Sequence, residues 1–132
     1  MSNSSLNYTI REIEENDIEC GGLLEVLEYL APVGGLVKPA AKAILKEIKS
    51  NPLHRIFVAV VQDGRNQGLI IGTTTLLVEP KFIFGGGRVA HIEDVAVRAE
   101  FPEERDWIQA CKIRYRASSD NAMRKNSTRL FR

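Results

Sequence analysis

Two adjacent acidic residues, Glu93 and Asp94, interrupt the apolar stretch AHIEDVAV, which follows a glycine cluster at 85–87. Carboxylates accept hydrogen bonds from ammonium and hydroxyl groups, and they lower the cost of holding an ammonium before it loses its proton. The pair therefore suits recognition of a protonated amine on a molecule rich in hydroxyls. The alternative is a solvated strand edge without a ligand.

The histidines and cysteines form no pattern typical of a metal site. Cys20 and Cys111 lie far apart and lack CxxC spacing, so we expect ordinary thiols rather than a disulfide framework or a zinc site. His91 lies two residues before Glu93 on the same strand face, and we expect a packed or structural histidine rather than a base. His54 is expected to be an ordinary helix-end residue. We expect no bound metal.

Two helices are expected near the N-terminus. Asn16-Asp17 are expected to cap the first, with a buried face made of Leu23, Leu24, Val26, Leu27 and Leu30. Pro39 is expected to begin the second, with Ala40, Ala43, Ile44 and Ile48 on one side and Lys42, Lys46 and Lys49 on the other. Asn51-Pro52 should end this second helix.

Strands are expected over 8–13, 55–62, 69–78 and 90–97, with the middle two joined by the turn sequence DGRNQG. A loop over 79–88 should lead into the last strand. The order β-α-α-β-β-β indicates an α+β fold with a largely antiparallel sheet. Regular alternation along the last strand would place Ile92, Asp94 and Ala96 on one face and Glu93, Val95 and Val97 on the other.

Length and composition limit the class of protein. A chain of 132 residues with 44% hydrophobic and 27% charged residues suffices for one domain with a core. No apolar run approaches the roughly 20 residues that cross a bilayer. The N-terminal residues lack the features of a signal peptide. We therefore expect a cytoplasmic protein without a membrane partner.

The sequence changes character after Phe101. All ten glycines lie at or before Gly87, and residues 105–132 carry eight Lys/Arg against two Asp/Glu, whereas residues 1–104 carry ten against fifteen. We therefore divide the chain into a body, residues 1–101, and an atypical basic tail, residues 102–132. The tail could be a nucleic-acid arm, but the negative body and the weak periodicity of the tail favour no nucleic-acid partner.

Over residues 8–101 the chain resembles the glucosamine-6-phosphate N-acetyltransferases of the GNAT superfamily. YTIREIEENDIE is similar to the family's first strand and helix cap, and LAPVGGL to its Leu-Thr-Thr-Val-Gly turn. EPKFIFGGGRVAHIEDVAV is similar to its Glu-x-Lys-x-Ile-His…Gly-His-Ile-Glu-Asp-x-x-Val segment. The resemblance implies the N-terminal part of a GNAT-like acyl-CoA N-acyltransferase fold, with an incomplete C-terminal half.

The resemblance also implies a reaction, its substrates and a site. The reaction is N-acetylation of glucosamine 6-phosphate by acetyl-CoA, a step toward UDP-N-acetylglucosamine, in an enzyme that is a homodimer when intact. It implies that the amino-sugar phosphate is bound by Lys81, Phe82, Ile83, Phe84, Glu93, Asp94 and Val95. It implies that the backbone of Val95, Ala96 and Val97 pairs with the pantetheine arm of acetyl-CoA. It identifies no catalytic residue.

The chain departs from the family pattern at several places. Ala31 stands where the family has a substrate-contacting threonine, and Phe84 where it often has histidine. The Gln/Arg-x-x-Gly-x-Gly loop that would hold the coenzyme A pyrophosphate is not recognisable after Phe101. Three interpretations stay open: an acetyltransferase that is inactive in this form, a non-catalytic GNAT remnant that binds a partner, or a GNAT enzyme acting on another primary amine.

A shifted reading frame near Phe101 would produce a glycine-free tail of this kind. Back-translated codons for PEERDWIQAC, read after removal of the first base, can encode Gln-Lys-Lys-Gly-Ile-Gly-Phe-Lys-Leu-Val, which contains the missing loop pattern. We expect the gene to carry these codons, which sequencing around codon 101 would show. Peptides from the native protein that cover WIQACK would instead establish the tail as genuine sequence.

Overall fold

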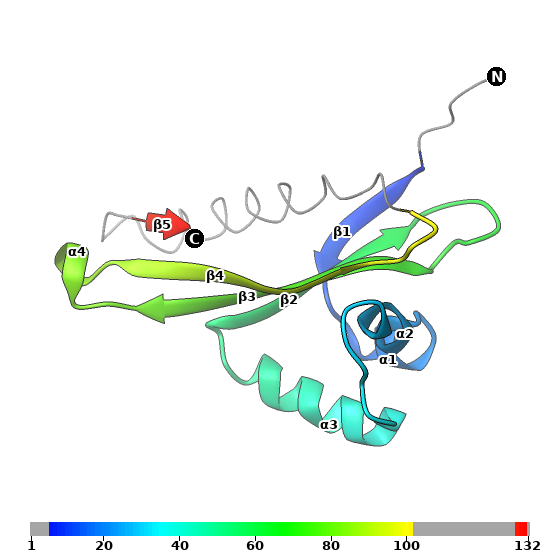
Figure 1. The fold of residues 1–132 in the computed structure, drawn as a ribbon, viewed down its shortest axis with the longest axis horizontal. Helices are drawn as coiled ribbons and strands as arrows, with labels where there is room; N and C mark the ends of the chain where they lie inside the picture. Colours follow the sequence, from blue (N-terminus) through cyan, green and yellow to red (C-terminus); the bar gives the residue numbers. More distant parts are fainter. Residues whose placement is uncertain (1–5, 102–128, 132) are drawn as a thin grey trace.

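The computed structural model describes residues 6–101 and 129–131 (Figure 1). Within these ranges no helix is long and apolar enough to cross a membrane. Apart from 129–131, the expected basic tail and the expected frameshift within it lie outside the described residues. The structure therefore addresses the body of the chain, which carries the candidate site.

The described strands form one sheet in the order β1-β2-β3-β4-β5, and the first three pairings are antiparallel. A short parallel pairing adds β5 to the outer edge of β4. The strands are β1 (Tyr8–Glu12), β2 (His54–Val61), β3 (Ile70–Pro80), β4 (Arg88–Val97) and β5 (Arg129–Phe131). The expected α+β fold with a largely antiparallel sheet is thus confirmed.

Three helices lie on one face of the sheet (Figure 1). They are α1 (Glu15–Glu19), α2 (Leu23–Glu28) and α3 (Lys38–Lys49). A fourth short element, α4 (Ile83–Gly86), forms the far tip of the long hairpin made by β3 and β4. The outer half of this hairpin projects beyond the helices, so the predicted substrate segment lies at a protruding end of the molecule.

The first helix is divided, contrary to the single helix expected from its apolar residues. α1 ends at Glu19, and Gly22, the N-cap residue of α2, has a φ of 78° in the left-handed region that favours glycine. A Cβ at Gly22 would lie 2.6 Å from Nη2 of Arg98. Glu14 occupies the N-cap position of α1, and Asp17, one of the two expected capping residues, caps the helix from the third helical position. The positive φ and the nearby Arg98 side chain both favour glycine at this break between the helices.

The buried face of α3 also differs from the expected one. Ala41 and Leu45 are buried, whereas Ala40, Ala43 and Ile44 are exposed. The helix packs only along a narrow stripe at i and i+4, because its outer side has no described neighbour. An apolar residue beside this stripe, such as Ile44, therefore remains at the surface.

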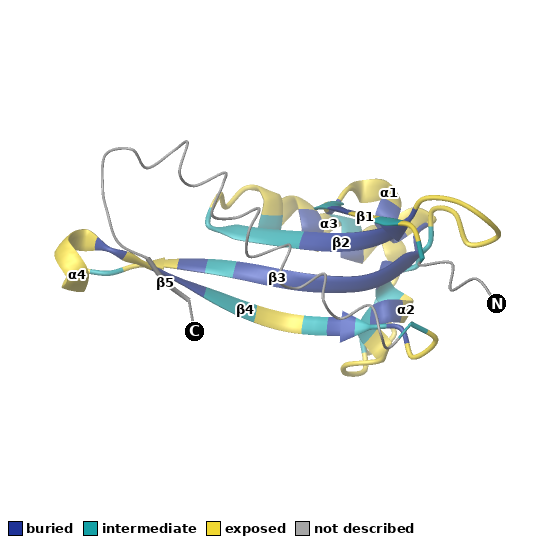
Figure 2. Cartoon of the chain, turned by 90° about the horizontal axis from the view of Figure 1, so that it is seen from above, coloured by how far each residue is buried: buried dark blue, intermediate teal, exposed yellow. Residues whose placement is uncertain are grey.

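The core has two parts, one on each face of the sheet, and Figure 2 shows buried residues running along the central strands β2 and β3. On the helix side, Val58 and Val60 pack with Ile13, Leu23 and Val26. On the opposite side, alternate residues of the same strands form a second cluster that includes Phe57, Ala59, Val61, Ile71 and Leu76. Both faces of the central strands are therefore apolar.

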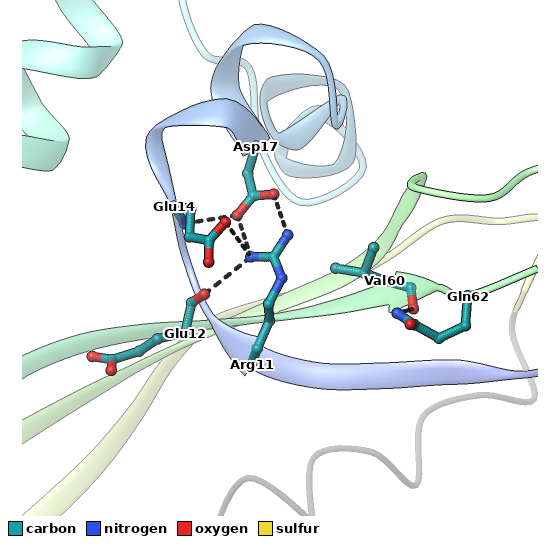
Figure 3. Close-up of polar contacts among 6 residues, drawn as sticks. All are labelled: Arg11, Glu12, Glu14, Asp17, Val60 and Gln62. Atoms are coloured by element: carbon teal, nitrogen blue, oxygen red, sulfur yellow. Dashed lines mark hydrogen bonds and ion pairs between the residues drawn. The ribbon is translucent and has the colours of Figure 1, made fainter.

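A buried carboxylate joins the first strand to the first helix (Figure 3). Asp17 is 2% exposed and accepts hydrogen bonds from both terminal nitrogens of Arg11, each at 2.7 Å. It also accepts the backbone N–H of Glu14, at 2.7 Å. This ion pair raises the pKa of Arg11 through the hydrogen bond to Asp17. Asp17 is thus both a helix cap and the partner of a half-buried guanidinium group.

Candidate functional site

A β-bulge in β4 lies at the acidic pair. Glu93 is opposite Thr75 and Ala96 is opposite Thr73, so a single residue of β3, Thr74, faces the two residues Asp94 and Val95. Asp94 has a φ of 49°, which aspartate tolerates better than most residues do. An extra residue of this kind bends the strand and redirects its side chains.

The bulge changes the faces expected from regular alternation. Because Thr73 and Thr75 share the helix face of β3, their partners Ala96 and Glu93 share it as well. Ile92 is opposite Leu76 and lies on the other face. The expectation that Ile92 and Ala96 point the same way, away from Glu93, is therefore wrong. Glu93 and Asp94 are both exposed and can reach a ligand.

The strand edge next to the bulge is open in the described part of the chain. β5 pairs with β4 only at Arg88, Val89 and Ala90. Beyond this point, over 91–97, the outer edge of β4 has no strand partner among residues 6–101 and 129–131. Backbone N–H and C=O groups on such an edge can pair with an extended ligand. Residues 95–97, expected to contact acetyl-CoA, lie on this edge.

The other predicted substrate residues lie at the tip of the β3–β4 hairpin. Phe82, Ile83 and Phe84 are exposed, and Phe84 has a φ of 56° in the left-handed turn that α4 contains. The backbone N–H of Lys81 donates to the carbonyl of Gly87, at 2.8 Å. That N–H group is therefore already bonded. Among the expected substrate-binding residues at the hairpin tip, Lys81 is the one with a cationic side chain.

A cluster of charged groups beside this tip was not expected from the sequence. Glu79 Oε1 lies 2.7 Å from Lys81 Nζ, and Glu79 Oε2 lies 2.9 Å from His91 Nε2. The two contacts lower the pKa of Glu79, with the larger effect from Lys81. Glu79 and His91 are twelve residues apart, so only the strand register could have revealed this pair. The side chain of His91 is about one-third exposed and is held by Glu79.

The exit of β4 is fastened to α2, which the sequence also did not reveal. Arg98 is buried and donates to the carbonyl oxygens of Ile70 and Gly22, at 2.7 and 3.2 Å, and contacts Glu25 of α2 at 3.2 Å. Tyr29, which follows α2, donates to Glu100 at 3.1 Å. These contacts fix the direction in which the chain leaves Val97.

The described residues contain no group of three or more His, Cys, Asp or Glu side chains that could hold a metal ion. His54 begins β2 and lines an open surface pocket with Glu12, Lys49 and Arg55, away from β4. Ala31 is exposed in the loop after α2. The candidate functional residues that lie near one another are therefore those on β4 and at the tip of the β3–β4 hairpin.

Comparison with known proteins relates this chain to one group of enzymes. Glucosamine 6-phosphate N-acetyltransferase 1 of Oryza sativa subsp. japonica is 36% identical over 92 residues, which are 70% of this chain and 54% of the relative. Glucosamine 6-phosphate N-acetyltransferase of Trypanosoma brucei brucei is 32% identical over 92 residues, which are 70% of this chain and 58% of the relative. The chain thus spans little more than half the length of these relatives. No family model matches it.

Solved structures show the same fold. Glucosamine-6-phosphate N-acetyltransferase from Arabidopsis thaliana superposes with a TM-score of 0.72, at 24% identity, over 96% of this chain and 82% of that chain. An aminoglycoside N-acetyltransferase in complex with CoA superposes with a TM-score of 0.64, at 17% identity, over 98% of this chain and 80% of that chain. The chain therefore has the GNAT acetyltransferase fold and is related in sequence to the glucosamine 6-phosphate N-acetyltransferases.

Proposed function

We propose that the chain acts in acetyl-CoA-dependent N-acetylation of glucosamine 6-phosphate, with residues 1–101 as the N-terminal part of the acetyltransferase domain. The observation that carries this proposal is the bulge in β4, which brings two exposed carboxylates and an open strand edge together. The names of the related enzymes support the choice of acceptor.

The acceptor is proposed to bind along the helix face of β4 and the hairpin tip. Glu93 and Asp94 would accept hydrogen bonds from the ammonium and hydroxyl groups of the sugar. The segment Lys81–Phe84 would lie at the phosphate end. The positively charged amine and the negatively charged phosphate of one molecule would thus each meet a group of opposite charge.

The donor is proposed to pair with the outer edge of β4. The backbone of residues 95–97 is extended, and in the described ranges this edge has no other strand beside it. Pairing of this kind depends little on side-chain identity, so Val95, Ala96 and Val97 need only favour a strand. Arg98 would help by holding the end of β4 against α2 and β3.

The reaction proposed for this arrangement is a direct transfer. The ammonium first loses one proton to solvent, and the nearby carboxylates hold the amine through its remaining N–H groups. The amine nitrogen then attacks the thioester carbonyl, a C–N bond forms, the C–S bond breaks, and the thiolate takes up a proton. The nitrogen loses its second proton after attack, which balances the proton taken up by the thiolate. The residues of this chain contribute mainly positioning and electrostatic stabilisation of the amine.

The test is an assay of free thiol release, with acetyl-CoA and glucosamine 6-phosphate supplied together. Because the glycine-rich loop is not recognisable in the sequence, we expect acetyl-CoA to bind more weakly than about 1 µM, or less favourably than about −8 kcal/mol, in calorimetry. At saturating acetyl-CoA, thiol release should depend on the amino-sugar phosphate. Faster release with an amine that lacks the sugar phosphate would favour another acceptor. No release at any donor concentration would favour a non-catalytic, partner-binding role.

A further inference from the structure

The charged cluster of Glu79, Lys81 and His91 has free hydrogen-bonding capacity. Glu79 holds one nitrogen of His91, and the other nitrogen, Nδ1, has no partner among the residues that the structure describes. Lys81 Nζ can donate three hydrogen bonds and has one described acceptor, Glu79. Both side chains are about one-third exposed. Lys81 and His91 are thus held on one carboxylate at the surface, where Lys81 can bind a further acceptor and His91 can do so through Nδ1 when its imidazole is protonated.

The position of this cluster relative to Glu93 is fixed by the strand. His91 and Glu93 are opposite Leu77 and Thr75, so they share one face of β4, two residues apart and before the bulge begins. Two such positions are separated by about 7 Å along a strand. The cluster around His91 could bind the anionic group of a small acceptor, and Glu93 could bind an ammonium at the other end of the same molecule.

We propose that His91, oriented by Glu79 and assisted by Lys81, binds the phosphate group of the acceptor and makes the site selective for phosphorylated amino sugars. This inference rests on the proposed function and assigns a specificity-determining residue to it.

The electrostatics of the cluster favour this role. The pKa of Glu79 is lowered by Lys81 and by His91, so its carboxylate stays ionised at the pH values near 6 where a phosphate monoester gains its second charge. With Nε2 of His91 held on Glu79, the imidazolium form has its Nδ1–H left to donate to a phosphate oxygen. The charged groups around His91 are Glu79 and Lys81 on the hairpin and Glu93 on β4.

The test uses the chain's two histidines, since His54 provides an internal control. The imidazole resonances are followed by NMR during titration with glucosamine 6-phosphate, glucosamine and inorganic phosphate. We expect glucosamine 6-phosphate to raise the pH midpoint of the His91 resonance and to leave His54 unchanged. Glucosamine should move neither midpoint, and inorganic phosphate should act only at higher concentration.

Variants separate a binding role from a structural one. His91→Gln should reduce the ratio of affinities for glucosamine 6-phosphate over glucosamine by about tenfold, because one charge-assisted hydrogen bond is lost. His91→Arg, which restores a cation, should recover most of this ratio. His54→Gln is the matched control and should leave the ratio unchanged. Thermal unfolding of each variant verifies that the fold is intact.

The outcomes distinguish this inference from the proposed function. If both sugars bind and His91→Gln preserves the wild-type ratio, the phosphate role of His91 is wrong while the proposed acceptor site stands. If the amino sugar binds nowhere on β4, both are wrong. A loss of phosphate selectivity in His91→Gln, with rescue by His91→Arg, supports both.

Discussion

Replacement of Asp17 by alanine is expected to lower the free energy of unfolding by about 3 kcal/mol, the lower end of the range for breaking a buried ion pair. The lower end applies because the side chain of Arg11 is one-third exposed and water can solvate it in part. The variant also loses the acceptor of the Glu14 N–H and hence the helix cap. Chemical denaturation monitored by circular dichroism measures the change.

A double-mutant cycle identifies the origin of this loss. If the pair is responsible, Arg11→Leu combined with Asp17→Ala should cost clearly less than the sum of the two single changes, because no unpaired charge remains. Asp17→Asn should fall between wild type and Asp17→Ala, since the amide oxygen can still accept the Glu14 N–H. Additive single changes would show that Arg11 and Asp17 stabilise the fold independently.

The double variant Glu93→Gln/Asp94→Asn is expected to weaken binding of glucosamine 6-phosphate by about a hundredfold, because two hydrogen bonds to charged groups are lost. Its melting temperature should change little, since both side chains are exposed. Asparagine is chosen at position 94 because it tolerates the positive φ found there. Calorimetric titration with the sugar phosphate measures the effect.

The matched control for this double variant is Glu47→Gln, which removes a carboxylate from the exposed side of α3. It should bind the sugar phosphate as the wild type does. Wild-type affinity in Glu93→Gln/Asp94→Asn would show that the carboxylates face solvent only. A large fall in melting temperature would instead indicate that the bulge needs the acidic side chains for its stability.

Local patterns were sufficient to predict most of the fold. The expected ends of β1 to β4 lie within about two residues of the observed ends. Alternation and the turn sequence DGRNQG are local signals, so they can be recognised without knowledge of the fold. The division of the first helix at Gly22 was missed, since the contact of Gly22 with Arg98 joins residues that are distant in sequence. The exposed side of α3 was misjudged because apolar content alone does not show which neighbours are present.

The candidate site was harder to predict than the strands that carry it. The acidic pair was identified from residue type, but its orientation depends on the pairing of Asp94 and Val95 with Thr74. The contact between Glu79 and His91 depends on the same pairing of β3 with β4. Residue types thus indicated the chemistry, while strand register determined which groups meet.

The bulge also bears on how this strand can change its length during evolution. In a regular strand, deletion of one residue turns every following side chain to the opposite face. At Asp94 and Val95 a deletion would instead leave one residue opposite Thr74 and keep Ala96 opposite Thr73. A one-residue gap could therefore arise here without exposing the core. The deletion would keep the packing of the sheet but remove the bend in β4. Ligand recognition could therefore be lost while the fold is retained.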